Sequence, residues 1–239
     1  KLLKIMSLNK IIVKNNGFMY PIIIGTNILN ELPKQIKTVC PKAKKIGIVI
    51  DKNIPKKFRT KIIKSLKKYK IYKFEYKASE KIKSFEQVEK LVNKCLQYNF
   101  NRNDILIAFG GGVIGDFCGF VASILKRGVN FINVPTTLLA QVDSSIGGKT
   151  GVNATQGKNL IGSFYQPKIV LTDISLLKSL PKREMICGFA EILKHSLILK
   201  KKFFKFLDIN SEKIINNSNT SLLKKAIYES CKIKLFYAN

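Results

Sequence analysis

The stretch AFGGGVIGDFCGF, residues 108–120, places four glycines within six positions. Gly110, Gly112 and Gly115 match the spacing G-x-G-x-x-G after an expected strand and before an expected helix. Glycines in that setting allow a tight turn and bring a pyrophosphate close to the unpaired N–H groups of the helix. The segment therefore predicts a dinucleotide site, although clustered glycines also form plain turns.

One part of the dinucleotide fingerprint is missing. An acidic residue about twenty positions after the glycines normally binds the ribose. Here that region reads FINVPTT and contains no acid. Asp51 ends an earlier apolar run, and we expect it to take this part, in an arrangement that differs from an ordinary Rossmann site.

Polar groups are dense in VPTTLLAQVDSSIGGKTGVN, residues 134–153. Thr136 and Thr137 follow an expected strand, where open sheets bind ligands, although threonine also caps helices. Lys149 and Lys158 lie in glycine-rich segments, where an ammonium can meet a phosphate as a point charge. Each lysine alone is more typical of a solvated surface.

Glu191 and His195 are one helical turn apart and could share a metal ion. An ordinary helix histidine is the alternative. His195 is the only histidine, and the cysteines at 40, 95, 118, 187 and 231 lack ligand spacing. From the residues alone, a complete metal site cannot be built from this chain.

These residues need strands and helices that alternate along the chain. We expect a hairpin around Asn15, Asn16 and Gly17, and later strands at 44–51, 70–76, 104–110, 130–135 and 168–173. Helices are expected at 55–70, 84–98, 113–125 and 136–146, with a loop at 147–159. This order predicts a doubly wound α/β fold.

The pattern changes after Pro181, where only helical periodicity remains. We therefore expect a Rossmann-like, dinucleotide-binding α/β domain at 1–179 and the start of an all-α domain at 180–239. The chain reaches Asn239 without a clear helix stop signal, and it does not begin with Met. Met6 is one candidate start, and a fragment is the other interpretation.

The formal charge is +28, from 43 Lys and Arg against 15 Asp and Glu. A nucleic-acid or anionic-membrane binder would fit this excess. The excess is spread along a chain rich in Lys, Ile and Asn, so we favour a compositional bias. The five cysteines are typical of reduced thiols in a cytoplasmic protein. The start, KLLKIMSLNK, does not resemble a signal peptide, and no apolar run is long enough for a bilayer span.

Four long motifs carry a resemblance to a known family. GGGVIGDFCGFVA, RGVNFINVPTTLLAQVDSSIGGKTGVN, GKNLIGSFYQP and GFAEILKH resemble the 3-dehydroquinate synthases, enzymes of the shikimate pathway, which leads to chorismate and the aromatic amino acids. The resemblance runs in order from MYPIIIG to the end of the chain. Glycerol and iron-dependent alcohol dehydrogenases share the cofactor turn, but QVDSSIGGKT and GKNLIG favour the synthase or a close sugar-phosphate cyclase.

The resemblance implies a lyase that uses NAD+ and a divalent metal, zinc or cobalt. NAD+ transiently oxidises 3-deoxy-D-arabino-heptulosonate 7-phosphate, phosphate is eliminated, the carbonyl is reduced again, and an aldol closure gives 3-dehydroquinate. The metal acts as a Lewis acid on the oxidised oxygen. The anionic substrate requires cationic groups, which fits the lysines above.

The resemblance also implies roles for individual residues. Cofactor contacts fall on Asp51, Asn53, Glu80, Lys83, Gly112, Val113, Ile114, Gly115, Asp116, Thr136, Thr137, Lys149, Lys158, Leu176, Leu177, Lys178 and Ser179. Catalytic and substrate contacts fall on Asp143, Lys149, Asn159 and Lys194, with Arg127 reaching in from a neighbouring subunit of a homodimer. Glu191 matches a metal ligand, whereas His195 does not.

Two departures from the family pattern affect these expectations. The family reads Asp-Gly-Glu where this chain has Ala78, Ser79 and Glu80, so we expect weaker adenosine binding. The family's other two metal ligands are histidines in a GHTFGHA-like region that this sequence does not reach. We therefore expect an incomplete metal site and a C-terminally truncated domain.

Three hypotheses follow. The chain is the N-terminal portion of a working synthase, or it is a decayed, non-catalytic remnant. The third, a nucleic-acid or membrane-surface binder, rests on charge alone. The motifs favour the first, with a sugar phosphate as substrate and no specific nucleic-acid or membrane partner.

Overall fold

A central sheet of seven strands organises the computed structural model, which describes residues 8–15 and 17–238. Its order is β1-β2-β9-β6-β5-β3-β4. The strands are β1 Asn9–Asn15, β2 Phe18–Gly25, β3 Lys45–Asp51, β4 Lys70–Tyr76, β5 Ile105–Gly110, β6 Asn130–Pro135 and β9 Ile169–Asp173. Neighbours run parallel from β2 to β4, and β1 pairs antiparallel with β2 at one edge. The predicted α/β fold is confirmed.

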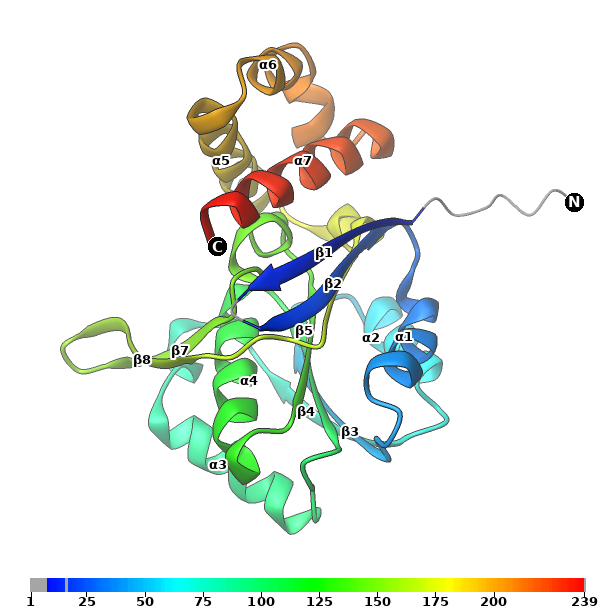
Figure 1. Cartoon of the computed structure of the whole chain (residues 1–239), viewed down its shortest axis with the longest axis vertical. Helices are drawn as coiled ribbons and strands as arrows, with labels where there is room; N and C mark the ends of the chain where they lie inside the picture. Colours follow the sequence, from blue (N-terminus) through cyan, green and yellow to red (C-terminus); the bar gives the residue numbers. More distant parts are fainter. Residues whose placement is uncertain (1–7, 16, 239) are drawn as a thin grey trace, which may run out of the picture.

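Helices cover both faces of the sheet, which explains the continuous apolar runs of its central strands. Every residue of β5 and β9 is buried. The helices α1 (Leu32–Val39) and α2 (Lys56–Ser65) share one apolar core with the sheet. The helices α3 (Phe85–Gln97) and α4 (Gly112–Ile124) share another on the opposite face (Figure 1).

Three helices follow Pro181 within the described residues: α5 Lys182–Leu199, α6 Lys201–Ile215 and α7 Thr220–Ala238. Their apolar side chains share a core with β1, β2 and β9 (Figure 1). As expected, no strand occurs after Pro181 in the part of the chain that the structure describes. The division into domains at 179 and 180 stays a prediction.

Short helical turns connect the larger elements. Their bounds are η1 Leu29–Glu31, η2 Glu80–Ile82, η3 Leu125–Arg127, η4 Ala140–Ser144 and η5 Ile174–Ser179. The segment 136–146, predicted as a helix, contains η4, which has π-helical geometry. Such π-turns are rare and occur often at functional sites.

The prediction of a loop at 147–159 is wrong. An antiparallel hairpin forms there from β7 (Lys149–Ala154) and β8 (Gly157–Phe164), and it projects from the body of the molecule (Figure 1). A glycine in each strand allows the two backbones to approach closely. A Cβ on Gly151 would lie 2.4 Å from the backbone oxygen of Ile161, and one on Gly162 would lie 2.0 Å from that of Thr150.

The strands β6 and β9 separate at their carboxyl ends. Their described pairing covers Ile132 with Ile169 and Asn133 with Val170. Beyond these pairs β6 continues beside β5, and β9 continues beside β2. The buried amide of Gln141 bridges the gap, because its Nε2 donates to the backbone oxygens of Pro135 and Asp173, each at 3.2 Å. Gln141 thereby fixes η4 above the opening.

All five cysteines lie in the described structure as free thiols, which agrees with the sequence analysis. Four of them are buried, and Cys187 on α5 is exposed. Burial raises the pKa of Cys40 to about 11 and that of Cys231 to about 12. Within the described residues, no helix has the length and apolarity needed to cross a bilayer.

We expect iodoacetamide at neutral pH to label Cys187 alone in the native protein, because the thiolate is the reactive species and the other thiols are buried. Intact-mass spectrometry should show one adduct before denaturation, and five after it. Rapid native labelling of Cys118 or Cys231 would contradict the described packing.

Candidate active site

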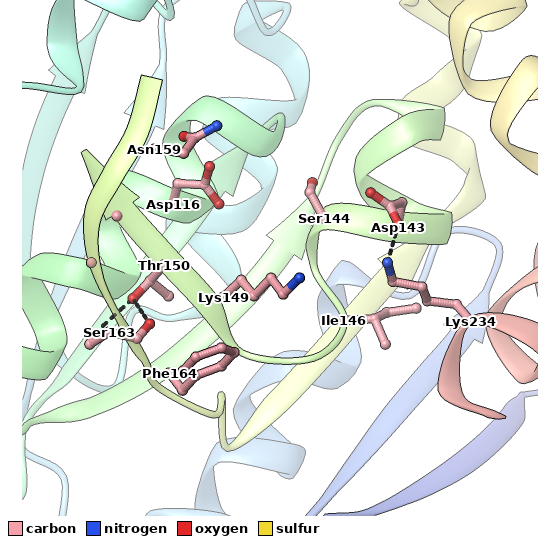
Figure 2. A pocket seen from close by; sticks show the side chains of 12 residues that line it. Asp116, Asp143, Ser144, Ile146, Lys149, Thr150, Asn159, Ser163, Phe164 and Lys234 are labelled. Atoms are coloured by element: carbon pink, nitrogen blue, oxygen red, sulfur yellow. Dashed lines mark hydrogen bonds and ion pairs between the residues drawn. The ribbon is translucent and has the colours of Figure 1, made fainter. Parts of the chain in front are cut away.

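A cavity of about 610 Å³ opens between the β7–β8 hairpin, η4 and α7. Twelve residues line it: Asp116, Asp143, Ser144, Ile146, Lys149, Thr150, Gly151, Asn159, Gly162, Ser163, Phe164 and Lys234 (Figure 2). Four predicted site residues meet there, namely Asp116, Asp143, Lys149 and Asn159. They come from α4, η4, β7 and β8, so the fold brings distant motifs together.

Two lysines supply positive charge to this pocket. Lys149 begins β7 and extends toward the side that holds Asp143 and Lys234 (Figure 2). Lys234 comes from α7, and its Nζ lies 2.6 Å from Asp143 Oδ1. An ammonium group can meet a phosphate or carboxylate oxygen as a point charge, so the pocket can hold an anionic ligand.

The glycine-rich turn lies at the start of α4 and is partly exposed at Gly111, Gly112 and Val113. Its glycines also admit neighbouring parts of the chain. A Cβ on Gly112 would lie 2.8 Å from Ser144 Oγ, and one on Gly111 would lie 3.0 Å from Thr137 Cγ2. The turn therefore touches η4 directly, while the N–H groups that open α4 remain suited to an anion.

Lys83 and Asp116 form a largely buried ion pair beside this turn. Lys83 Nζ lies 2.6 Å from Asp116 Oδ2, and the Lys83 side chain is 3% exposed. Lys83 also donates to Asn159 Oδ1 on the hairpin. Burial is the largest effect and raises the pKa of Asp116, the Lys83 ammonium acts in the opposite direction, and Glu80 and Asp143 raise it further.

The remaining predicted cofactor residues lie along the carboxyl ends of the strands. Asp51 Oδ1 accepts hydrogen bonds from the N–H groups of Asn53 at 3.0 Å and Ala78 at 3.3 Å. Ala78 replaces the family's aspartate, and its backbone is held by Asp51. Glu80 accepts a hydrogen bond from Asn153 on β7 at 2.8 Å.

The two threonines differ in their surroundings. Thr136 is buried, and its N–H donates to the backbone oxygen of Gly110 at 2.9 Å. Thr137 Oγ1 accepts from the N–H of Ala140 at 3.2 Å, so it caps the turn into η4. Leu176 and Leu177 are buried in η5, where their backbone oxygens accept hydrogen bonds from Ser179 Oγ and from the N–H of Leu180. Lys178 and Ser179 follow them in η5.

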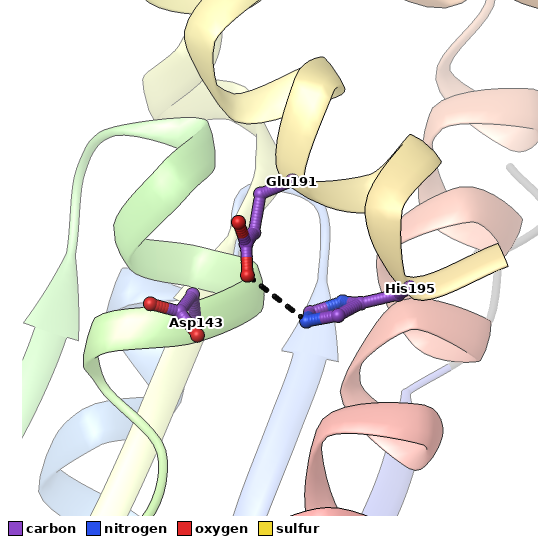
Figure 3. A group of neighbouring side chains, drawn as sticks. All are labelled: Asp143, Glu191 and His195. Carbon is purple, nitrogen blue, oxygen red and sulfur yellow. Dashed lines mark ion pairs between the residues drawn. The ribbon is translucent and has the colours of Figure 1, made fainter. Parts of the chain in front are cut away.

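Three side chains form a cluster beside the pocket. One ligand atom each from Asp143, Glu191 and His195 lies within 4.8 Å of the others (Figure 3). Glu191 and His195 come from α5, and Asp143 comes from η4. Close packing holds α5 there, because a Cβ on Gly188 would lie 2.5 Å from Leu138 Cβ.

The cluster fits a divalent metal ion. Glu191 Oε1 is buried and lies 2.5 Å from Lys194 Nζ and 3.2 Å from His195 Nε2, so a positively charged group already lies at this oxygen. His195 Nδ1 lies 2.6 Å from Ser230 Oγ, which orients Nε2 toward Glu191. Carboxylate oxygens and an oriented imidazole are common ligands for zinc and similar metals.

Some predicted residues lie away from this centre. Arg127 is exposed in η3, with a positive φ of 62°, and does not line the pocket. Lys158 is 70% exposed and lies 4.0 Å from Glu80. Lys194 is 58% exposed beside Glu191. The predicted roles of these residues stay predictions.

Two contributions to the site were not predicted from the sequence. Lys234 was not singled out, because one lysine among many on a helix carries no distinguishing signal. Asp143 was predicted as a substrate contact, yet it also lies beside Glu191 and His195. Asp143 comes close to Glu191 and His195 because α5 packs against η4, and the sequence pattern does not predict this packing.

The chain is similar to known proteins in sequence and in fold. Residues 73–187 match the family model for the 3-dehydroquinate synthase N-terminal region. A 3-dehydroquinate synthase of Pelagibacter ubique is 52% identical over 229 residues, which cover 96% of this chain and 62% of the relative. A relative of the same name from Buchnera aphidicola is 44% identical, with 93% and 60% covered. The chain thus spans about three fifths of the length of these relatives.

Solved structures share the fold. A 2-deoxy-scyllo-inosose synthase, complexed with carbaglucose-6-phosphate, NAD+ and Co²⁺, superposes with a TM-score of 0.87 at 26% identity, covering 96% of this chain and 62% of that one. A butanol dehydrogenase from Thermotoga maritima has a TM-score of 0.74 at 14% identity, covering 95% and 64%, which shows likeness of fold alone.

We expect the pKa of His195 to lie below its ordinary value of about 6.5. Burial is the largest cause and lowers this pKa, Glu191 and Asp143 raise it, and Lys194 and Lys234 lower it. Because His195 is the only histidine, an NMR titration of its ring protons gives the pKa without ambiguity.

The shift has a consequence for stability. Between the lowered native pKa of His195 and its unfolded value, the unfolded state binds more protons than the native state. The free energy of unfolding is therefore highest, as far as His195 determines it, above about pH 6.5, and it falls as the pH falls through this range. His195→Gln should reduce the decline of the urea midpoint between pH 7.5 and 5.5. A native pKa above 6.5 would contradict this account.

Proposed function

The chain belongs to the 3-dehydroquinate synthase family, and on that premise we propose that it forms the cofactor-binding part of a phosphate-eliminating cyclase. The proposed reaction converts 3-deoxy-D-arabino-heptulosonate 7-phosphate to 3-dehydroquinate and phosphate. One observation carries the proposal: Lys149 and Lys234 line one pocket together with Asp116 of the glycine-rich helix α4 and Asp143, a member of the carboxylate–imidazole cluster. Relatives at 52% and 44% identity with this name favour it over other cyclases.

The residues divide the work by their chemistry. The start of α4 is suited to the pyrophosphate of NAD+, with Asp51 and Glu80 farther along the sheet edge. When bound, NAD+ would supply the oxidant and the metal a Lewis acid. Lys149 and Lys234 would bind anionic oxygens of the substrate, and Asp143, beside both Lys234 and Glu191, would orient its hydroxyl groups.

We also propose that the protein acts as a cytoplasmic homodimer. Arg127 supports this arrangement, because it is exposed and does not line the pocket of its own chain. Its side chain is therefore available to the pocket of a neighbouring subunit. Analytical ultracentrifugation at micromolar concentration tests the dimer directly.

We expect Lys149→Met to weaken binding of the sugar phosphate about tenfold, because one charge-assisted contact is lost. Titration calorimetry without NAD+ measures this affinity in the absence of turnover. Lys64→Met is the matched control, since Lys64 lies on α2, away from the pocket. Equal affinity of both variants would contradict the assignment of the pocket, and failure of the unaltered chain to bind NAD+ would overturn the proposed function.

Metal binding provides a separate test. We expect Glu191→Gln to weaken Co²⁺ binding by more than about tenfold, because it removes the carboxylate from the cluster. The visible absorption of bound Co²⁺ reports the site without any turnover. Glu184→Gln, on the exposed first turn of the same helix, should leave the titration unchanged. Identical titrations for both variants would exclude the cluster as the metal site.

A further inference from the structure

We propose that Asn153 is a positioning residue that fixes the cofactor side and the substrate side of the pocket relative to each other. Asn153 matches none of the predicted site residues, and it does not line the cavity. Its contacts nevertheless join Glu80, predicted to contact the cofactor, to Asn159, predicted to contact the substrate. The inference rests on the proposed function and assigns a role within that same site.

Both ends of the Asn153 side chain are engaged. Its Nδ2 donates to Glu80 Oε2 at 2.8 Å, and its Oδ1 accepts from the N–H of Asn159 at 3.0 Å. Its own N–H donates to the backbone oxygen of Lys83 at 2.8 Å. The register of the hairpin shifts here, because Val152 pairs with Ile161 and Ala154 pairs with Gly157, so the extra residues lie on β8 opposite Asn153 and include Asn159.

The two contacts determine the orientation of the amide. An N–H group faces one end, and a carboxylate faces the other. With the amide turned over, its oxygen would face the carboxylate and its NH₂ would face another donor. Only a side chain with one acceptor and one donor at this length satisfies both neighbours, which explains asparagine here rather than aspartate or alanine.

The contact to Asn159 supports a left-handed backbone conformation. Asn159 has a φ of 58°, in the region that asparagine adopts more readily than most residues other than glycine. Its N–H is held by Asn153, and its Oδ1 accepts from Lys83, which in turn pairs with Asp116. The contacts therefore form a closed circuit through η2, α4 and the hairpin. Displacement of Asn153 would release Asn159 from one side and Glu80 from the other.

Two substitutions separate these contacts. Asn153→Asp keeps the acceptor for Asn159 but sets a carboxylate against Glu80, so NAD+ affinity should fall about tenfold. Sugar-phosphate affinity should change less than about threefold at 0.15 M salt, where the Debye length is only about 8 Å. Asn153→Ala removes both contacts, and both affinities should fall, each by about five- to tenfold.

A compensating change tests positioning against a general loss of structure. Glu80→Gln in the Asn153→Asp background restores a donor opposite an acceptor, so NAD+ affinity should return to within about threefold of the Glu80→Gln single variant. Lys158 is 70% exposed and its Nζ lies 4.0 Å from Glu80 Oε1, so their ion pair is weak. The loss of this ion pair in the Glu80→Gln variants therefore contributes little to the change in NAD+ affinity. Asn219→Asp is the matched control and should change neither affinity, because Asn219 Oδ1 only accepts hydrogen bonds, from the N–H groups of Ser221 and Leu222, and the residue does not line the pocket.

Titration calorimetry with NAD+, and separately with the sugar phosphate, measures every variant. The inference is overturned if Asn153→Asp weakens both ligands equally or neither, or if the double variant recovers no affinity. These failures presuppose that the unaltered chain binds both ligands. If the unaltered chain binds neither, the proposed function fails and this inference fails with it.

Discussion

The carboxyl ends of β6 and β9 part from each other, and the buried amide of Gln141 bridges the gap between them. Parallel sheets bind ligands where neighbouring strands diverge in this way, because the backbone there leaves a crevice. Each amide hydrogen meets one carbonyl, so the bridge fixes η4 in place. Asp143 and Ser144 on η4 then face the hairpin and α7, and the contact of Ser144 with Gly112 joins this turn to the cofactor segment.

Much of the fold was predictable because its signals are local. Apolar runs mark strands buried on both faces, and the glycine-rich segment between β5 and α4 has a spacing with a physical reason. The contrast between the strand-containing part and the helices after Pro181 was also visible in the periodicity. Asp116, Lys149 and Asn159 were singled out by motif and resemblance, and the structure places them in one pocket.

Other features depend on contacts between distant segments. Residues 147–159 looked like a loop because they are rich in glycine, whereas in the structure Gly151 lets the two backbones of a hairpin approach. The neighbourhood of Asp143 and Glu191 arises from helix packing, which periodicity does not encode. The left-handed backbone of Asn159 was not predicted from the sequence, because position 159 is not a glycine. A hydrogen bond to Asn153 on the other strand supports this conformation.

The hairpin gathers Lys149, Thr150, Asn159, Ser163 and Phe164 onto one protruding ribbon (Figures 1 and 2). These groups cannot be displaced independently, because the ladder between β7 and β8 ties them into a single rigid piece. A small change in the tilt of the hairpin would therefore carry the whole set toward or away from α7. Anion binding would therefore depend on the orientation of the whole hairpin rather than on the separate rotamers of its side chains.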